Sequence, residues 1–203
     1  MKPLDDPRYR LMTSIAALVH ARGYAAVGVD EVCRTARVKK GSFYYFFRSK
    51  QQLMVAALEQ RWQQAEAKLL AAAFAADVPP LRRIDRLFEL AANLEQDAKR
   101  RGGHVLGCPF GNLSAEISAS DEPMRRKIAE VLARLADAFA ATIREAVAAQ
   151  ELPADVDARA TGAALVAYFE GVRLLARTHN EPKLIRQFGR RALVFATRRR
   201  GRS

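Results

Sequence analysis

A short segment rich in cations and aromatic residues is the part of this sequence best suited to contact a polyanion. Lys39 and Lys40 supply two adjacent positive charges, and Gly41 would let a backbone approach closely. Tyr44 and Tyr45 are long enough to reach a phosphate or a thymine methyl group. We therefore expect this segment to face nucleic acid rather than the protein core.

Two short helices must position these side chains. The apolar spacing predicts one helix over residues 29–37 and another over 40–47, with a tight break between them. The small side chain of Ala36 lets the second helix cross closely, as a helix-turn-helix requires, and the second helix then enters the major groove. Phe43 and Phe47 are four residues apart and belong to the core, so at least one tyrosine points outward. The predicted DNA contacts are Arg37, Lys39, Lys40, Gly41, Ser42, Tyr44, Tyr45 and Lys50.

The rest of the chain is also predicted to be helical, which makes the fold all-α with about nine helices. Alternation typical of strands is absent from the sequence pattern. Ser49 and Gln52 have the spacing of a capping box, and Asn180 has the position of a helix N-cap before a proline. The expected helices cover residues 6–22, 29–37, 40–47, 49–78, 81–100, 109–118, 122–150, 155–178 and 181–198.

Charge is concentrated at the two ends of the chain. The 203 residues have a net charge of +12. Residues 1–50 contribute +6, residues 182–203 contribute +8, and the long middle is nearly neutral at −2. This asymmetry points to a polyanionic partner, although arginine can also serve solubility, and the C-terminal arginines are expected to form a solvated tail. No apolar run is long enough to span a bilayer, and the N-terminus lacks a signal-peptide core, so we expect a cytoplasmic protein without a membrane partner.

Residues 8–58 resemble the DNA-binding domain of the TetR family of bacterial transcriptional regulators. The matching positions are Arg10, Gly23-Tyr24, the segment 29–32, the segment 38–50 and Leu53. The chain departs from the family pattern at four places, one of which is Tyr45 or Phe46, where the family commonly has a histidine. Val27 replaces a threonine that commonly touches a phosphate, Lys39 replaces a serine, and Arg37 replaces a glycine in the turn. If that turn needs a positive φ, Arg37 costs roughly 1 kcal/mol in strain.

The resemblance implies a ligand-responsive repressor. It would be a homodimer that binds a pseudo-palindromic, double-stranded operator and is released by a small-molecule inducer. Residues 1–48 would form the three-helix DNA-binding domain, and residues 49–203 the helical ligand-binding and dimerisation domain. The last two helices of each subunit would pair with those of the partner, although their apolar stripes could equally belong to the subunit's own core. The candidate interface residues are Tyr168, Val172, Leu175, Leu184, Phe188 and Phe195.

A noncovalent ligand is expected between the middle helices, in a pocket lined by leucine, phenylalanine and methionine side chains with a few polar groups. Each candidate could instead be ordinary core. The candidates are Trp62, Phe88, Asn93, Cys108, Phe110, Asn112, Phe139, Tyr168 and Phe169.

The segment around Cys108 is similar to a subset of the family that responds to small electrophiles such as N-ethylmaleimide and acrylate. Cys108 precedes Pro109, where a helix would begin, and a helix N-terminus favours the reactive thiolate. Arg173, Arg177 or His104 could assist. Two interpretations stay open: Cys108 is a redox or electrophile sensor, or it is an inert buried residue. The second cysteine, Cys33, lies on a packing face and is expected to be structural.

The sequence contains no motif for a metal site, a cofactor site or an enzyme active site. The three histidines are isolated, and there is no phosphate-binding glycine loop, nucleophile elbow or metalloprotease motif. Glu116 and Asp121 are interpreted as surface or capping residues. The alternative function is an all-helical binding or scaffold protein whose basic ends hold nucleic acid or a membrane without sequence preference.

Overall fold

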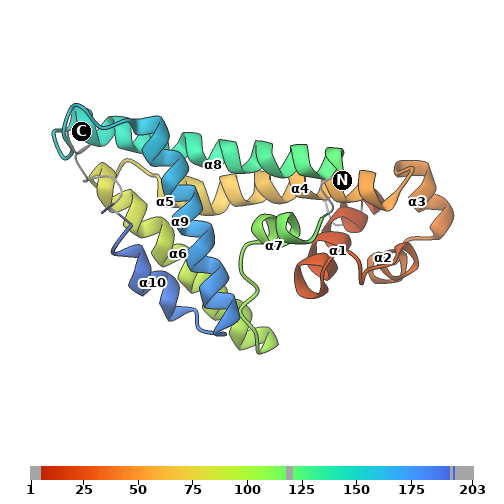
Figure 1. The fold of residues 1–203 in the computed structure, drawn as a ribbon. Coiled ribbons are helices and arrows are strands. Elements are labelled where there is room, and N and C mark those ends of the chain that lie inside the picture. The colour runs from red at the N-terminus through yellow and green to blue at the C-terminus, as the bar shows by residue number, and fades with distance from the viewer. Residues whose placement is uncertain (1–5, 118–120, 193, 195–203) are drawn as a thin grey trace. The chain divides into compact units, whose positions relative to one another are not determined.

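The computed structural model describes residues 6–117, 121–192 and 194, and all regular structure in these residues is helical (Figure 1). Helices α4, η2 and α5 run on without a break, so the described residues form nine continuous helices, as predicted. The elements are α1 (Pro7–Arg22), α2 (Val29–Ala36), α3 (Lys40–Phe46), α4 (Lys50–Ala65), the π-helical turn η2 (Glu66–Leu70), α5 (Ala71–Ala73), α6 (Pro80–Gly102), α7 (Pro109–Glu116), α8 (Glu122–Ala148), α9 (Ala158–Thr178) and α10 (Lys183–Gly189).

The chain packs as two compact units. The first comprises Met1–Gln64 and Pro109–Val131, and the second comprises Ala65–Cys108 and Leu132–Ser203. The first unit is larger than the expected DNA-binding domain of residues 1–48, because it also contains α4 up to Gln64, all of α7 and the first part of α8.

In the first unit, α1 packs against α2, α3 and α7. Its apolar stripe, which includes Leu11 and Ile15, is fully buried together with Phe43 of α3. The capping box at the start of α4 is confirmed in part: the backbone N–H of Gln52 donates to Ser49 Oγ at 3.1 Å, and Gln52 Oε1 accepts from the backbone N–H of Arg48 at 2.7 Å. The reciprocal bond thus reaches one residue further back than the usual capping box.

In the second unit, α10 packs against both α6 and α9 (Figure 1). Two glycines permit close packing in this unit, one where α9 meets α8 and one where α10 meets α6. A Cβ at Gly162 would lie 2.6 Å from the carbonyl oxygen of Ala136 on α8, and a Cβ at Gly189 would lie 2.5 Å from the side chain of Phe88 on α6. The small residue at 162 therefore serves contact between helices of the same chain.

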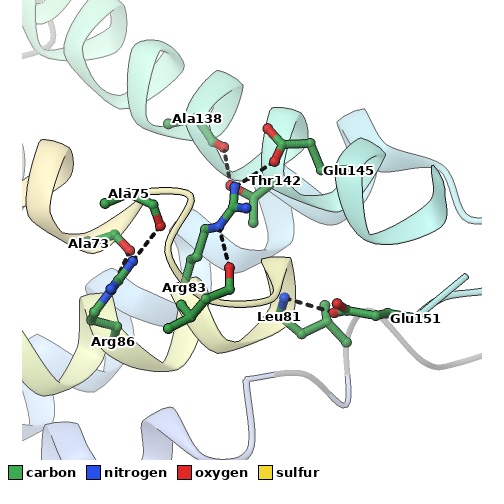
Figure 2. Close-up of polar contacts among 10 residues, drawn as sticks. Ala73, Ala75, Leu81, Arg83, Arg86, Ala138, Thr142, Glu145 and Glu151 are labelled. Carbon is green, nitrogen blue, oxygen red and sulfur yellow. Dashed lines mark hydrogen bonds and ion pairs between the residues drawn. The ribbon is translucent and has the colours of Figure 1, made fainter. Parts of the chain in front are cut away.

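Arginines tie the start of α6 to the chain before it and to α8 (Figure 2). Arg83 donates to the carbonyl of Val78 at 3.0 Å and pairs with Glu145 of α8. Arg86 donates to the carbonyl oxygens of Ala73 and Ala75 at 2.9 and 2.6 Å. These carbonyls belong to the last residue of α5 and to the chain between α5 and α6, so the two guanidinium groups satisfy backbone acceptors that have no helical partner.

The C-terminal end differs from the expectation. Helix α10 ends at Gly189, short of the predicted residue 198, and Pro182 rather than Asn180 precedes its first residue. Asn180 has a positive φ of 51° and instead binds the loop after α6, accepting from the backbone N–H of Val105 at 2.8 Å. Phe195 and the C-terminal arginines lie outside the described residues. Within the described residues, no helix is both long and apolar enough to cross a bilayer.

Candidate DNA-binding surface and thiol site

Helix α3 has one buried and one exposed face, as the sequence predicted. Phe43 and Phe47 are 0% and 2% exposed. Tyr44 and Tyr45 are 55% and 84% exposed, and they are two of the most exposed large apolar side chains of the described residues. The exposed face has no need of such side chains for folding, which leaves them available to a partner.

The cations of this segment lie at the start of α3. Lys39 is the exposed N-cap residue, and Lys40 is exposed but pairs with Asp30 of α2 at 2.7 Å. The hydrogen bond to Asp30 raises the pKa of Lys40. A Cβ at Gly41 would meet no atom of the described chain within 4 Å, so packing there does not require glycine. Ser42 is half-buried beside them.

The turn between α2 and α3 has the positive φ at which Arg37 was expected to be strained. Arg37 has φ 53° and ψ 47°, and its backbone N–H caps α2. The arginine therefore occupies a conformation that glycine adopts more cheaply. Before the turn, Cys33 is buried on the packing face, as expected, and burial is the main cause that raises its pKa.

Lys50 was predicted to contact DNA, but its ammonium group is bound within the protein. Its Nζ donates to the carbonyl oxygens of Tyr24 and Val27, each at 3.0 Å, and lies 3.9 Å from the centroid of the Tyr24 ring. Burial lowers the pKa of Lys50. Its ammonium group thus holds the turn between α1 and α2. Val27 is 1% exposed and belongs to the core. Its apolar side chain cannot bind a phosphate.

Glu116 was expected to be a surface or capping residue, and the structure gives it a specific partner. Its two carboxylate oxygens accept from the backbone N–H groups of Tyr24 and Ala25, each at 2.7 Å. This contact joins residues more than ninety positions apart, which helical periodicity cannot foresee. The α1–α2 turn is therefore bound through its N–H groups by Glu116 and through its carbonyls by Lys50.

The second candidate site surrounds the loop that ends at Cys108. Glu95 of α6 is buried, and its Oε2 accepts from the backbone N–H groups of Leu106 and Gly107 at 2.9 and 3.1 Å. Arg173 of α9 donates to Glu95 Oε1 at 3.1 Å and to the carbonyl of Gly107 at 3.0 Å. Cys108 is 5% exposed. A carboxylate and a guanidinium therefore fix the backbone beside the thiol from two helices.

Arg173 also acts on the thiol electrostatically. Burial opposes its charged form, but the neighbouring Cys108, Glu170 and Glu95 outweigh burial and raise the pKa of Arg173. Arg173 therefore lies within electrostatic reach of the Cys108 thiol. The other expected helpers, His104 and Arg177, are exposed.

The importance of Glu95 was missed from the sequence, although a signal for it exists. Glu95 falls on the same buried stripe of α6 as Phe88 and Ala91. A carboxylate on a mostly apolar stripe needs a buried partner, because an unpaired charge there is very costly. That pattern indicates a partner for Glu95, although it does not identify Arg173.

The structure brings together some of the candidate ligand residues and separates others. Phe88, Phe139, Tyr168 and Phe169 form one aromatic cluster in the second unit. The ring centroids of Phe88 and Phe169 lie 5.0 Å apart, and those of Phe139 and Phe169 lie 6.5 Å apart. Phe74 joins the cluster at 5.7 Å from Phe139.

The other candidates lie elsewhere. Trp62, Phe110 and Asn112 belong to the first unit, and Asn93 is exposed and accepts a hydrogen bond from Arg186 at 2.7 Å. The candidate ligand residues, which were chosen by residue type, therefore belong to two different compact units.

A cavity of about 340 Å³ lies between α6 and α10, and its lining is charged rather than apolar. Of the predicted ligand residues, Phe88 is the one that lines it. The lining residues are Arg82, Asp85, Phe88, Glu89, Arg186, Gly189 and Arg190. Among the described residues, no group of histidine, cysteine and acidic side chains could hold a metal ion.

The candidate dimer residues divide between core and surface. Val172 is 3% exposed and packs inside its own unit, whereas Leu175 is 43% exposed. Tyr168 and Phe188 are half-buried and are joined by a hydrogen bond from the tyrosine hydroxyl to the Phe188 carbonyl at 2.8 Å. Leu184 is also half-buried. The two apolar stripes therefore serve the subunit's own core in part, and Leu175 remains available to a second copy.

Two family profiles match the chain. The profile described as "Bacterial regulatory proteins, tetR family" matches residues 11–57, and the profile described as "Tetracyclin repressor-like, C-terminal domain" matches residues 80–192. The second covers more than half of the chain.

Individual relatives agree with these profiles. The chain is 36% identical over 170 residues to the transcriptional regulator AcuR of Cereibacter sphaeroides, which covers 83% of this chain and 75% of that protein. It is 32% identical over 120 residues to the transcriptional repressor NemR of Escherichia coli strain K12, covering 59% and 58%. The crystal structure of a regulatory protein TetR from Rhodobacter sphaeroides has a TM-score of 0.78 and 33% identity, and the match covers 90% of this chain and 95% of that one.

Proposed function

Because the chain belongs to the TetR family of bacterial transcriptional regulators, we propose that it is a repressor that binds a pseudo-palindromic operator and releases it when an inducer binds. The exposed face of α3 carries this proposal. Tyr44 and Tyr45 project from a helix that is anchored on its other side by Phe43, with Lys39 at its N-terminus. A short helix with a basic start and an exposed outer face can enter the major groove, where its N-terminal side chains reach base edges and phosphates.

The test uses DNA from upstream of the protein's own gene. Fluorescence anisotropy is measured with that DNA and with a scrambled duplex over a range of salt concentrations. Tight binding of the upstream DNA alone supports the proposal. Equal, low-salt binding of both duplexes favours instead the alternative function, a helical protein that holds nucleic acid without sequence preference.

Lys39→Ala separates phosphate contact from mere surface charge. Each lost phosphate contact reduces the slope of log K against log salt by roughly 0.9. Lys183→Ala removes an equal charge from the other unit and should leave the slope unchanged. An unchanged slope in Lys39→Ala would remove this residue from the phosphate contacts.

The domain organisation follows from the same proposal. Residues 1–48 would bind DNA, and residues 49–203 would bind the inducer and form the homodimer through α9 and α10, with Leu175 in the interface. Such a regulator acts in the bacterial cytoplasm, needs no cofactor and catalyses no reaction. Sedimentation of wild type and Leu175→Glu tests the interface, since a buried charge there should separate the subunits.

We further propose that Cys108 senses electrophiles. The support is the network of Glu95 and Arg173, whose guanidinium lies within electrostatic reach of the thiol and binds the carbonyl of the preceding residue, Gly107. Addition of the thiolate to the activated carbon–carbon double bond of an electrophile forms a carbon–sulfur bond, breaks the π bond, and leaves a carbanion that takes a proton from water. The adduct enlarges a residue that is almost fully buried, so the surrounding chain must shift.

The experiment is to label native protein with N-ethylmaleimide and measure operator binding. Release of DNA by the wild type and retention by Cys108→Ala support the proposal. Cys33→Ala is the matched control, because it removes the other buried thiol and should respond as the wild type does. Release that persists in Cys108→Ala contradicts the sensor role.

A further inference from the structure

The α1–α2 turn (residues 23–28) is shaped around the carboxylate of Glu116, the last residue of α7. Consecutive N–H groups of Tyr24 and Ala25 point at its two oxygens. Gly23 has φ +90°, and a Cβ there would lie 3.0 Å from each of these oxygens. Successive N–H groups that converge on an anion form a backbone nest, and this nest needs glycine at its edge.

Side chains from other helices bind the backbone of this turn. Within the backbone, Gly23 closes α1 and the N–H of Val27 donates to the carbonyl of Tyr24 at 3.3 Å. The carbonyls of Tyr24 and Val27 accept from Lys50, and the Val27 side chain is buried in the core. Glu116 is the side chain that binds the N–H groups of Tyr24 and Ala25 at the start of the turn. Because α2 begins at Val29, directly after the turn, a shift of the turn is passed to the first residues of α2.

The opposite end of α7 begins at Pro109, the residue after Cys108. Helix α7 has eight residues, about 12 Å at 1.5 Å per residue, and an isolated helix of that length is not stable in water. Its conformation therefore depends on packing, which buries Phe110 and Leu113, and on what holds its ends. One end continues into the loop that Glu95 and Arg173 bind, and the other ends in Glu116.

We propose that Glu116 is a positioning residue for operator binding: it fixes the α1–α2 turn, and with it α2, in the DNA-binding conformation, and a displacement of α7 reaches the helix-turn-helix through it. The inference rests on the proposed operator binding. It adds a route by which a change at Cys108, directly before α7, alters the affinity for DNA. Glu116 touches no DNA in this scheme.

Glu116→Gln gives a result whose sign distinguishes positioning from electrostatics. The amide keeps one acceptor oxygen but directs an NH₂ group toward a backbone N–H, so one of the two bonds is lost. Removal of a negative charge alone would strengthen binding to DNA. Loss of the ordered turn weakens binding instead, because the free protein then spends less time in the competent conformation. Since Glu116 is exposed and partly screened by water, we expect operator binding about 3- to 10-fold weaker.

Glu122→Gln is the matched control. Glu122 is exposed in the same unit at the start of α8, pairs with Arg125, and its substitution changes the net charge equally. Operator affinity is measured by anisotropy at one salt concentration, and thermal unfolding shows that both variants fold. Glu122→Gln should bind as tightly as the wild type or slightly tighter. The inference is overturned if Glu116→Gln binds as tightly as this control.

Amide hydrogen exchange supplies a readout that needs no DNA. In Glu116→Gln, the amides of Tyr24 and Ala25 should exchange at least several-fold faster, while that of Leu11 in the core of α1 is unchanged. Unchanged protection of the two turn amides overturns the inference even if no operator is found. If the wild type binds no operator specifically, the proposed function fails and the positioning role fails with it.

The route from the thiol is tested with N-ethylmaleimide on wild type and Glu116→Gln. The wild type should lose more operator affinity on labelling than the variant, whose turn is already released from α7. An equal fold-change in both proteins overturns the coupling through Glu116. No effect on the wild type overturns the sensor role of Cys108 and the coupling together, whereas the anisotropy comparison still decides the positioning role.

Discussion

Replacing Glu95 by glutamine should destabilise the protein far more than removing any exposed carboxylate. Glu95 is 4% exposed and accepts three hydrogen bonds, from the N–H groups of Leu106 and Gly107 and from Arg173. Glutamine has one acceptor oxygen for these three donors. It also leaves the guanidinium of Arg173, whose side chain is 15% exposed, without its carboxylate.

The size of the effect follows from that geometry. Removing one partner of a buried ion pair typically costs about 3–5 kcal/mol. Arg173 keeps its hydrogen bond to the Gly107 carbonyl and some contact with water, so we expect the lower end, about 3 kcal/mol. For a chain of this size, 1 kcal/mol shifts Tm by roughly 2–4 °C. Glu95→Gln should therefore melt about 6–12 °C below the wild type.

The assay is urea unfolding and thermal melting at one protein concentration, because the stability of a dimer depends on concentration. Asp97→Asn is the control on the same helix: its pair with Arg100 is 3.7 Å long and both side chains are more than half exposed, so it should cost less than about 0.5 kcal/mol. The double variant Glu95→Gln/Arg173→Met should lose at least about 1 kcal/mol less than the sum of the single variants. A Glu95→Gln protein as stable as Asp97→Asn would refute the reasoning.

Three further predictions concern single positions. Gly162→Ala should destabilise by about 1–3 kcal/mol in urea unfolding because its Cβ would overlap the backbone of α8, whereas Gly171→Ala on the same helix, where a Cβ meets nothing within 4 Å in the described chain, should be neutral or stabilising by up to about 1 kcal/mol. Arg37→Gly should raise the free energy of unfolding by about 0.5–1 kcal/mol, since it removes the left-handed strain at φ 53°, and no gain would show that the arginine is compensated elsewhere. Asp30→Asn should release Lys40 from its ion pair, tighten operator binding and steepen its salt slope by up to about 0.9, and an unchanged slope would show that the pair with Asp30 does not keep Lys40 from a phosphate.

The parts of the fold that were predicted from sequence depend on local spacing. The two faces of α3 follow from residues three and four apart, and burial of Phe43 with exposure of Tyr45 confirms that reasoning. The helix start at Lys50 follows from the local capping signal of Ser49 and Gln52, which acts within one turn. The end of α10 was wrong, because a long apolar stripe predicts where a helix can continue but not where packing ends it.

The contacts of the candidate sites were less predictable because they join distant segments. Lys50 was expected to face DNA, and nothing in its neighbours shows that the carbonyls of Tyr24 and Val27 lie within its reach. The same holds for Glu116. The aromatic ligand candidates were chosen by residue type, and type does not decide to which compact unit a side chain belongs. Glu95 is the exception, since its place on an apolar stripe can be seen in the sequence.

Glu95 binds the start of the segment from Leu106 to Glu116, and Glu116 is the last residue of that segment. These two carboxylates differ in exposure, and the difference decides which of their contacts breaks first. Glu95 is buried, so its hydrogen bonds cannot be replaced by water without a large cost. Glu116 is exposed, and water can take over its bonds to the α1–α2 turn with little change in free energy. A force applied to α7 from its thiol end should therefore break the contact at Glu116 before it breaks the network at Glu95. An inducer then has to supply only the modest free energy that separates bound from released turn, while the fold of the second unit stays intact.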